Sequence, residues 1–169
     1  SGLEDEHHQS VAKAFALSYD QVQTTDPTDA QALALLARAA YLAPDEPIPA
    51  DLLLETAGID RDAVEAAVQG NDALNRLIEL GLLEPLADGG LRLHRLLARF
   101  VQEVAADQSA HEAVERVLLE RATQLNEVGY PAQLVPLQPH LRAITDAAIP
   151  RQDARADLLC TTMAKHLSQ

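Results

Sequence analysis

The segment 82–104 places the tightest limit on the fold, because it joins two short apolar runs and a tight turn to a strongly amphipathic helical pattern. Two short apolar runs, 83–86 and 91–93, flank Asp88-Gly89-Gly90, and these glycines supply the positive φ that a tight hairpin needs. From His94 onward the apolar spacing becomes helical, with one side formed by Leu96, Leu97, Phe100, Val101 and Val104. The segment therefore predicts a small antiparallel hairpin that leads directly into an amphipathic helix.

The rest of the chain is predicted to be almost entirely helical. Hydrophobic residues make up 47% of the 169 residues and aromatic residues only 3%, so the core is expected to consist of Leu, Ala, Val and Ile. Three prolines make 43–49 an extended connector. Thr28 or Asp29 is predicted to cap the second helix, and Asp60 the fourth, which Gly70-Asn71 would end. The expected helices span 10–23, 29–42, 50–57, 60–70, 72–80, 94–106, 109–127, 140–148 and 153–167.

This order predicts a mainly α fold: a winged helix-turn-helix with one small β-hairpin, followed by an α-helical hairpin or bundle region. We expect residues 1–9 to be a disordered tail, in which Ser1-Gly2 is typical of a cloning remnant. Residues 10–106 would form the winged-helix domain. Residues 107–169 would form a helical region that leads into repeats. The natural protein is expected to extend beyond both ends.

Charge argues against a nucleic-acid partner. The net charge is −13, whereas binding to phosphates needs basic surface. The clearest basic stretch, 91–102, contains three arginines, one histidine and no acid. No apolar run is long enough to span a membrane, and the single cysteine, Cys160, fits a reducing cytoplasm. The pair His7-His8 lacks further metal ligands at a suitable spacing, so no metal site is predicted.

The succession of elements resembles the winged-helix region of the STAND or NB-ARC nucleotide-switch ATPases. The resemblance covers roughly residues 10–106. The residues that carry it are Ser18-Tyr19-Asp20, Ala34-Leu35-Leu36-Ala37, Tyr41-Leu42-Ala43-Pro44, Ile48-Pro49, the run from Leu74 to Leu83, and the run from Leu91 to Leu97. In that family a nucleotide-binding core with a Gly-x-x-x-x-Gly-Lys-Ser/Thr loop lies N-terminal to this region, and tetratricopeptide repeats often follow it. The loop does not occur in this sequence, so the resemblance implies a non-catalytic fragment that binds no cofactor alone.

The resemblance assigns His94 to the family's Met-His-Asp-type motif, whose histidine contacts the β-phosphate of ADP. A helix N-terminus offers N–H groups to a phosphate and disfavours the imidazolium, so a neutral ring N–H would be the donor. Arg92 and Arg95 would add positive potential. The sequence departs from the motif at Leu93, which replaces Met, and at Arg95, which replaces Asp. The alternative role for His94 is to cap or pack at the junction between hairpin and helix.

The resemblance implies a regulatory module of a cytoplasmic signalling protein. It would couple an ATPase core, with ADP or ATP bound, to a C-terminal repeat sensor through contacts within one polypeptide. Two alternatives stay open: a winged-helix DNA-binding regulator that uses 72–80 for recognition, and a free-standing helical adaptor for protein partners. Arg95 and Arg99 share a helix face, where they would contact nucleotide or the core, or pair with Glu103 or the acidic N-terminal third.

Overall fold

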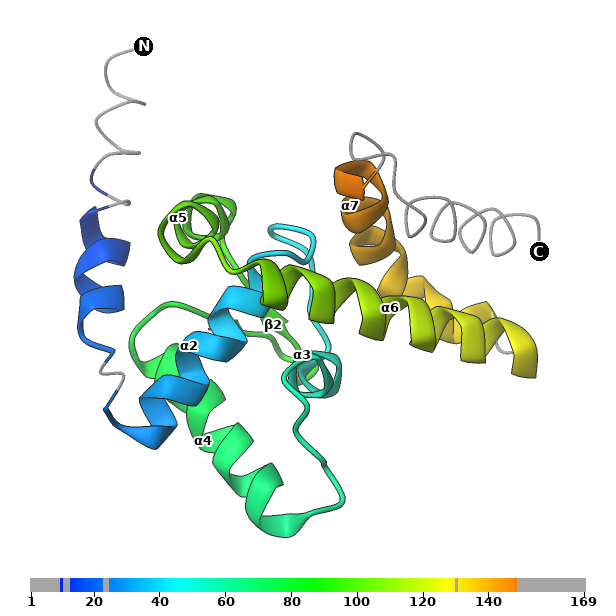
Figure 1. Cartoon of the computed structure of the whole chain (residues 1–169), viewed down its shortest axis with the longest axis horizontal. Coiled ribbons are helices and arrows are strands. Elements are labelled where there is room, and N and C mark those ends of the chain that lie inside the picture. Colours follow the sequence, from blue (N-terminus) through cyan, green and yellow to red (C-terminus); the bar gives the residue numbers. More distant parts are fainter. Residues whose placement is uncertain (1–9, 11–12, 23–24, 130, 149–169) are drawn as a thin grey trace.

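The computed structural model describes residue 10 and residues 13–22, 25–129 and 131–148, and all structural statements below concern these residues. The chain is mainly helical, with one two-stranded antiparallel sheet, as predicted. Figure 1 shows the helices around α2, which crosses α4 on one side and approaches α5 and α6 on the other. The predicted tail 1–9, the last predicted helix 153–167 and Cys160 lie outside the described residues.

Helix α2 (Pro27–Ala39) begins earlier than predicted. Its cap is Asp26, whose carboxylate accepts hydrogen bonds from the Thr28 N–H at 2.8 Å and the Asp29 N–H at 3.3 Å. The predicted caps Thr28 and Asp29 were therefore wrong. Pro27 explains the difference, because proline is favoured at the first helical position, where its missing N–H costs nothing. Asp29 is instead buried and pairs with Arg76 at 3.0 Å.

Helices α3 (Ala50–Thr56) and α4 (Val64–Glu79) follow the connector. The prediction of two helices over 60–80 was wrong, because α4 runs without interruption through Gly70. This glycine is buried in the helix, and a Cβ placed there would meet Leu54 Cδ2 at 3.0 Å and two atoms of Ile59 at 3.3 Å. Gly70 thus permits a close approach and does not end the helix. Asp60 accepts the Asp62 N–H in a turn before α4 and does not cap it.

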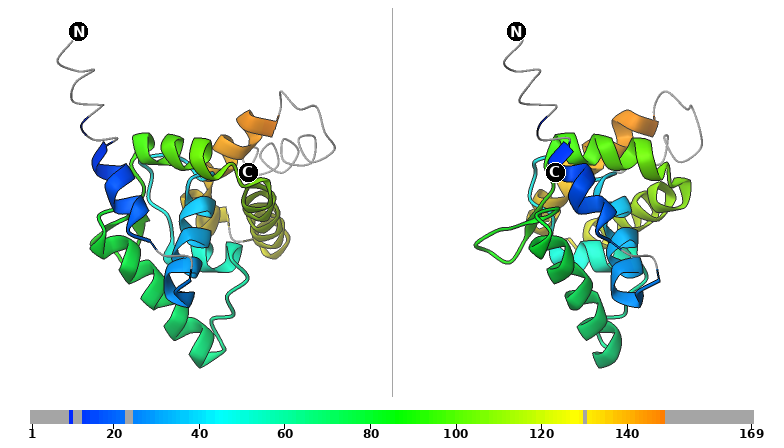
Figure 2. Two further views of the ribbon diagram at one scale, coloured as in Figure 1. Left: turned by 60° about the vertical axis from the view of Figure 1, so that its left-hand side comes forward. Right: turned by 90° about the vertical axis from the view of Figure 1, so that its left-hand side faces the viewer.

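The predicted hairpin is confirmed, with shorter strands than expected. Strand β1 (Glu84–Pro85) pairs with β2 (Leu91–Arg92) in the register Glu84 with Arg92 and Pro85 with Leu91. Ile48, in the connector, adds an isolated antiparallel bridge to Leu91, with hydrogen bonds of 2.7 and 2.9 Å. The right-hand view of Figure 2 shows the green hairpin loop projecting from the side of the helical body.

Four further helical elements follow the hairpin. Helix α5 (Arg95–Ala105) follows the hairpin, and α6 (Gln108–Val128) begins at the cap Asp107. A 3₁₀ segment, η1 (Pro131–Leu137), then leads into α7 (Gln138–Ala148). One hydrophobic core runs through all of these elements, since Leu35, Leu77, Leu97, Leu118 and Leu141 belong to the same buried cluster. The part after residue 106 is therefore packed on the part before it, chiefly where α6 meets α2 and α3.

Candidate functional site

His94 lies where the hairpin enters α5. It is the N-cap residue of α5, and its Nδ1 accepts a hydrogen bond from the Leu96 N–H at 3.1 Å. A ring nitrogen that accepts carries no proton, so the neutral ring has its proton on Nε2. The side chain is exposed. The capping role considered for His94 is thus present, and it leaves the Nε2–H group as a donor.

A cleft of about 420 Å³ lies beside the His94 ring. The Phe15 ring packs against the imidazole, with 5.9 Å between centroids. Arg92 also lines this cleft, whereas Arg95 lies on a neighbouring cleft with Arg99. The structure thus brings together two of the three predicted site residues. The cleft is lined by Phe15, Asp45, Gly81, Leu82, Glu84, Arg92 and His94.

Arg92 is bound by an acid from the opposite strand. Its Nη2 lies 2.8 Å from both carboxylate oxygens of Glu84, and its Nε lies 3.0 Å from Oε2. These hydrogen bonds raise the pKa of Arg92. The pairing follows from the register, which places Glu84 directly opposite Arg92. Arg92 would therefore have to share its charge between Glu84 and any phosphate.

Asp45 is a site residue that sequence reasoning missed. Its carboxylate accepts from Arg95 Nε at 2.6 Å and from the Arg95 backbone N–H at 3.2 Å. The hydrogen bond from the Arg95 side chain lowers the pKa of Asp45. Asp45 has a φ of 62° and donates its own N–H to the Leu93 carbonyl at 3.0 Å. Its position in a Pro-rich segment gave no local signal of a contact with α5.

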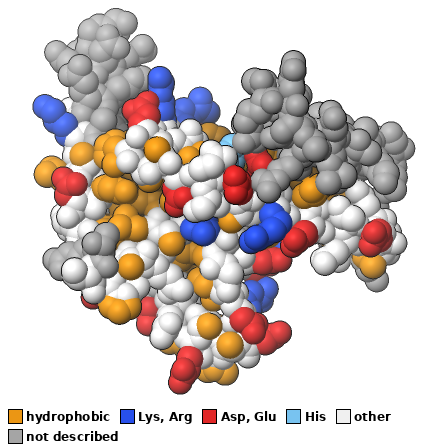
Figure 3. Space-filling view, viewed as in Figure 1, with side chains coloured by type: hydrophobic (Ala, Val, Ile, Leu, Met, Phe, Trp, Pro, Cys, Tyr) orange, Lys and Arg blue, Asp and Glu red, His pale blue; other side chains and the backbone are white. Residues whose placement is uncertain are grey.

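These contacts correct one expectation about the start of α5. Free backbone N–H groups were predicted there, but Asp45 accepts the Arg95 N–H and His94 accepts the Leu96 N–H. Arg99 pairs with Glu103 at 3.5 Å, so all three arginines of the predicted basic stretch have acidic partners. Figure 3 likewise shows acidic and basic side chains intermixed on the face it displays. The Nε2–H of His94 is therefore the site's clearest donor for an anion.

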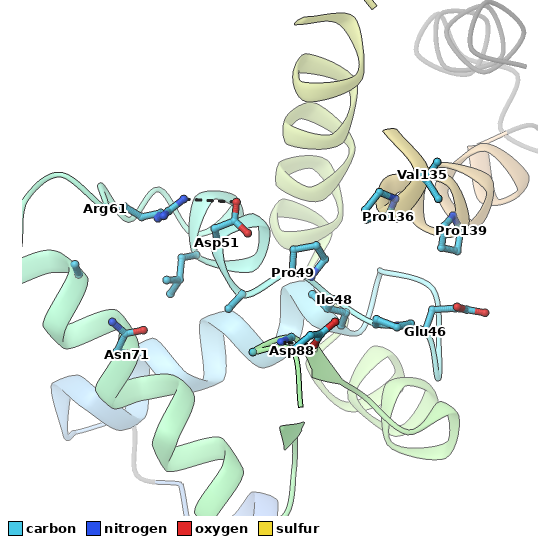
Figure 4. A pocket seen from close by; sticks show the side chains of 16 residues that line it. Glu46, Ile48, Pro49, Asp51, Arg61, Asn71, Asp88, Val135, Pro136 and Pro139 are labelled. Atoms are coloured by element: carbon cyan, nitrogen blue, oxygen red, sulfur yellow. Dashed lines mark hydrogen bonds and ion pairs between the residues drawn. The ribbon is translucent and has the colours of Figure 1, made fainter. Parts of the chain in front are cut away.

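A larger cavity of about 870 Å³ was not predicted (Figure 4). It lies between the hairpin turn at Asp88, the connector at Glu46, helices α3 and α4, and the segment from Val135 to Pro139. Asp51 pairs across it with Arg61 at 3.5 Å. The cavity and the cleft at His94 have no lining residue in common.

Two classes of site find no support in the part of the chain that the structure describes. No group of three or more His, Cys, Asp or Glu side chains there is arranged to hold a metal ion, and His7-His8 lie outside that part. None of the helices there has the length and apolar character needed to cross a membrane. Comparison of the chain with protein-family models, with curated proteins and with solved structures finds no match.

Proposed function

We propose that this chain carries the winged-helix regulatory module of a STAND or NB-ARC-type nucleotide-switch ATPase. In this proposal His94 contacts the β-phosphate of ADP held by a nucleotide-binding core outside this sequence. The element order supports the winged helix: α2, the bridging residue Ile48, α3, α4, the hairpin and then α5. The bridge adds one antiparallel residue pair beside the two-stranded hairpin.

The observation that carries the proposal is the hydrogen bond from the Leu96 N–H to His94 Nδ1. It fixes the ring at the mouth of α5, and in a neutral ring it places the proton on Nε2. A neutral imidazole that donates to phosphate is the group that the switch requires. The bond also fixes the orientation of the ring before nucleotide arrives, which lowers the entropic cost of the contact.

Asp45 supports the proposal because it brings a carboxylate to the place where Arg95 replaces the Asp of the family motif. Arg95 occupies the place of the motif's Asp, so the motif itself brings no acid to the start of α5. Asp45 supplies a carboxylate there from the connector and binds the Arg95 backbone N–H at 3.2 Å. The start of α5 therefore still has a carboxylate beside it, although from a different part of the chain.

A duplex-DNA interface is less well supported. Helix α4 would be the recognition helix, but it contains three acids, Glu65, Asp72 and Glu79. Its one basic residue, Arg76, donates through Nε to Asp29 at 3.0 Å. In the hairpin, Glu84 and Asp88 add negative charge where a wing would approach phosphates. These features favour a role in protein regulation over one in DNA binding.

The test compares two substitutions of His94 in the gene product that contains this chain. His94→Asn retains an N-cap acceptor and removes the imidazole, whereas His94→Ala removes both. A hydrogen bond to a charged group contributes about 1.5–3 kcal/mol, so we expect His94→Asn to speed ADP release roughly 10- to 150-fold. The release of a fluorescent ADP analogue measures this rate.

Arg116→Ala is the matched control, because Arg116 is exposed on α6 and lines neither of the clefts at the start of α5. Its release rate should equal that of the unchanged protein. If His94→Asn also releases ADP at the unchanged rate, the imidazole has no part in holding nucleotide and the proposed function is wrong.

A further inference from the structure

His140 connects α7 to the segment that holds the start of α5. It is the third residue of α7 and is fully buried. Its Nδ1 accepts the Ala43 N–H at 3.0 Å, and its Nε2 donates to the Pro47 carbonyl at 2.8 Å. One imidazole ring thus binds the connector at Ala43, where it begins, and at Pro47, two residues before it ends.

The middle of the same connector is bound by the residues on either side of His94. Between the two His140 contacts, Asp45 donates its N–H to Leu93 and binds Arg95 through its carboxylate. Leu93 and Arg95 flank His94 in the sequence. The connector is therefore held by α7 at Ala43 and Pro47, and by the residues around His94 at Asp45, which lies between them.

We propose that His140 is a positioning residue that couples the placement of α7 to the placement of His94. Displacement of α7 would withdraw both ring nitrogens from the connector and remove the hydrogen bonds of the ring to the Ala43 N–H and the Pro47 carbonyl. The connector would then shift, and Asp45 with it. The physical coupling stands on these contacts alone, while its effect on nucleotide rests on the proposed function.

The first experiment measures amide hydrogen exchange by NMR in the full 169-residue chain. His140→Asn keeps an acceptor near the Ala43 N–H but cannot reach Pro47. We expect exchange at Asp45 and Leu96 to accelerate about tenfold or more, although the hydrogen bonds of His140 go to Ala43 and Pro47. The exposed Arg142 on the same helix provides the control, and Arg142→Ala should leave both amides unchanged. Acceleration confined to Ala43 would overturn the coupling.

A second experiment changes Asp45 and leaves the buried His140 in place. Coupling between two sites is reciprocal, so removal of the Asp45 side chain should alter the surroundings of His140. Asp45→Gly suits this purpose because glycine accepts a φ of 62° without strain. We expect the His140 ring nitrogen shifts to move in a long-range ¹⁵N–¹H spectrum. Unchanged shifts would overturn the proposal even if His140→Asn did not fold.

Nucleotide release separates this proposal from the proposed function. In the complete gene product, His140→Asn should speed ADP release as His94→Asn does, but through the connector. Faster exchange at Leu96 with no effect of His94→Asn on ADP would support the coupling and reject the nucleotide role. An effect of His94→Asn on ADP without faster exchange in His140→Asn would support the nucleotide role and reject the coupling.

Discussion

Replacement of Gly70 by alanine should destabilise the protein, although alanine is the better helix former. In an open helix, Gly→Ala adds about 1 kcal/mol of stability. Here the new Cβ would lie 3.0 Å from Leu54 Cδ2 and 3.3 Å from Ile59 Cδ1 and Cγ2. Overpacking of a tight core costs about 1–3 kcal/mol, so we expect a net loss of about 1 kcal/mol. For a chain of this size the midpoint of thermal unfolding would fall by about 2–4 °C.

Asn71→Ala is the matched control for this prediction. Asn71 is the next residue in α4 and its side chain is exposed. Alanine there should add roughly 0.5 kcal/mol through helix propensity alone. Urea unfolding followed by circular dichroism at 222 nm measures both variants. The two substitutions should move the midpoint in opposite directions.

A double substitution tests the cause of the loss at Gly70. Ile59→Val removes Cδ1, one of the three atoms that the new Cβ would meet. We expect Gly70→Ala with Ile59→Val to be less destabilising than the sum of the two single changes, by roughly 0.5–1 kcal/mol. A Gly70→Ala variant that is about 1 kcal/mol more stable than the parent would refute the reasoning, because it would mean that α4 has room at this position.

Two further predictions concern His140 and Asp26. Burial lowers the pKa of His140, although the hydrogen bond to Pro47 and the Glu46 carboxylate oppose the shift. The folded state therefore binds this proton less readily than the unfolded chain, and the free energy of unfolding should fall as the pH drops below about 6.5, by at most about 1.4 kcal/mol per pH unit. His140→Asn should flatten that dependence, and an equal slope in both proteins would contradict the assignment. Separately, Asp26→Ala should cost about 1 kcal/mol through loss of the α2 cap, measured by urea unfolding. Thr28→Ala should change stability by less than about 0.5 kcal/mol, and the reverse order of effects would restore Thr28 as the cap.

The sequence predicts the elements of this fold better than it predicts their boundaries. The hairpin and the helices that carry clear apolar periods lie where they were expected. Gly70 was misassigned because a glycine in a helical pattern either ends the helix or permits a close contact, and only its spatial neighbours decide which. The cap of α2 could have been predicted, since Asp26 directly precedes a proline at the first helical position.

The candidate site shows where sequence reasoning stops. The position of His94 at the start of a helix follows from local pattern alone. Its surroundings do not, because Asp45 reaches Arg95 from the connector and His140 reaches that connector from α7. Such contacts join residues that are far apart in the chain, so no periodic pattern in the nearby sequence predicts them. The basic stretch shows the same difference: the pair of Arg99 with Glu103 follows from their spacing on one helix, whereas only the fold reveals Glu84 and Asp45 as the partners of Arg92 and Arg95.

The bridge between Ile48 and Leu91 determines when the hairpin can form. Strands of two residues are too short to be stable in water by themselves, so β1 and β2 depend on the connector for support. That support closes a loop that contains α3 and α4, and long loops close late because their closure costs entropy. We therefore expect the hairpin to form after the helices during folding. It should also be among the first elements to open under mild denaturation, which would release His94 while most of the helical core is still intact.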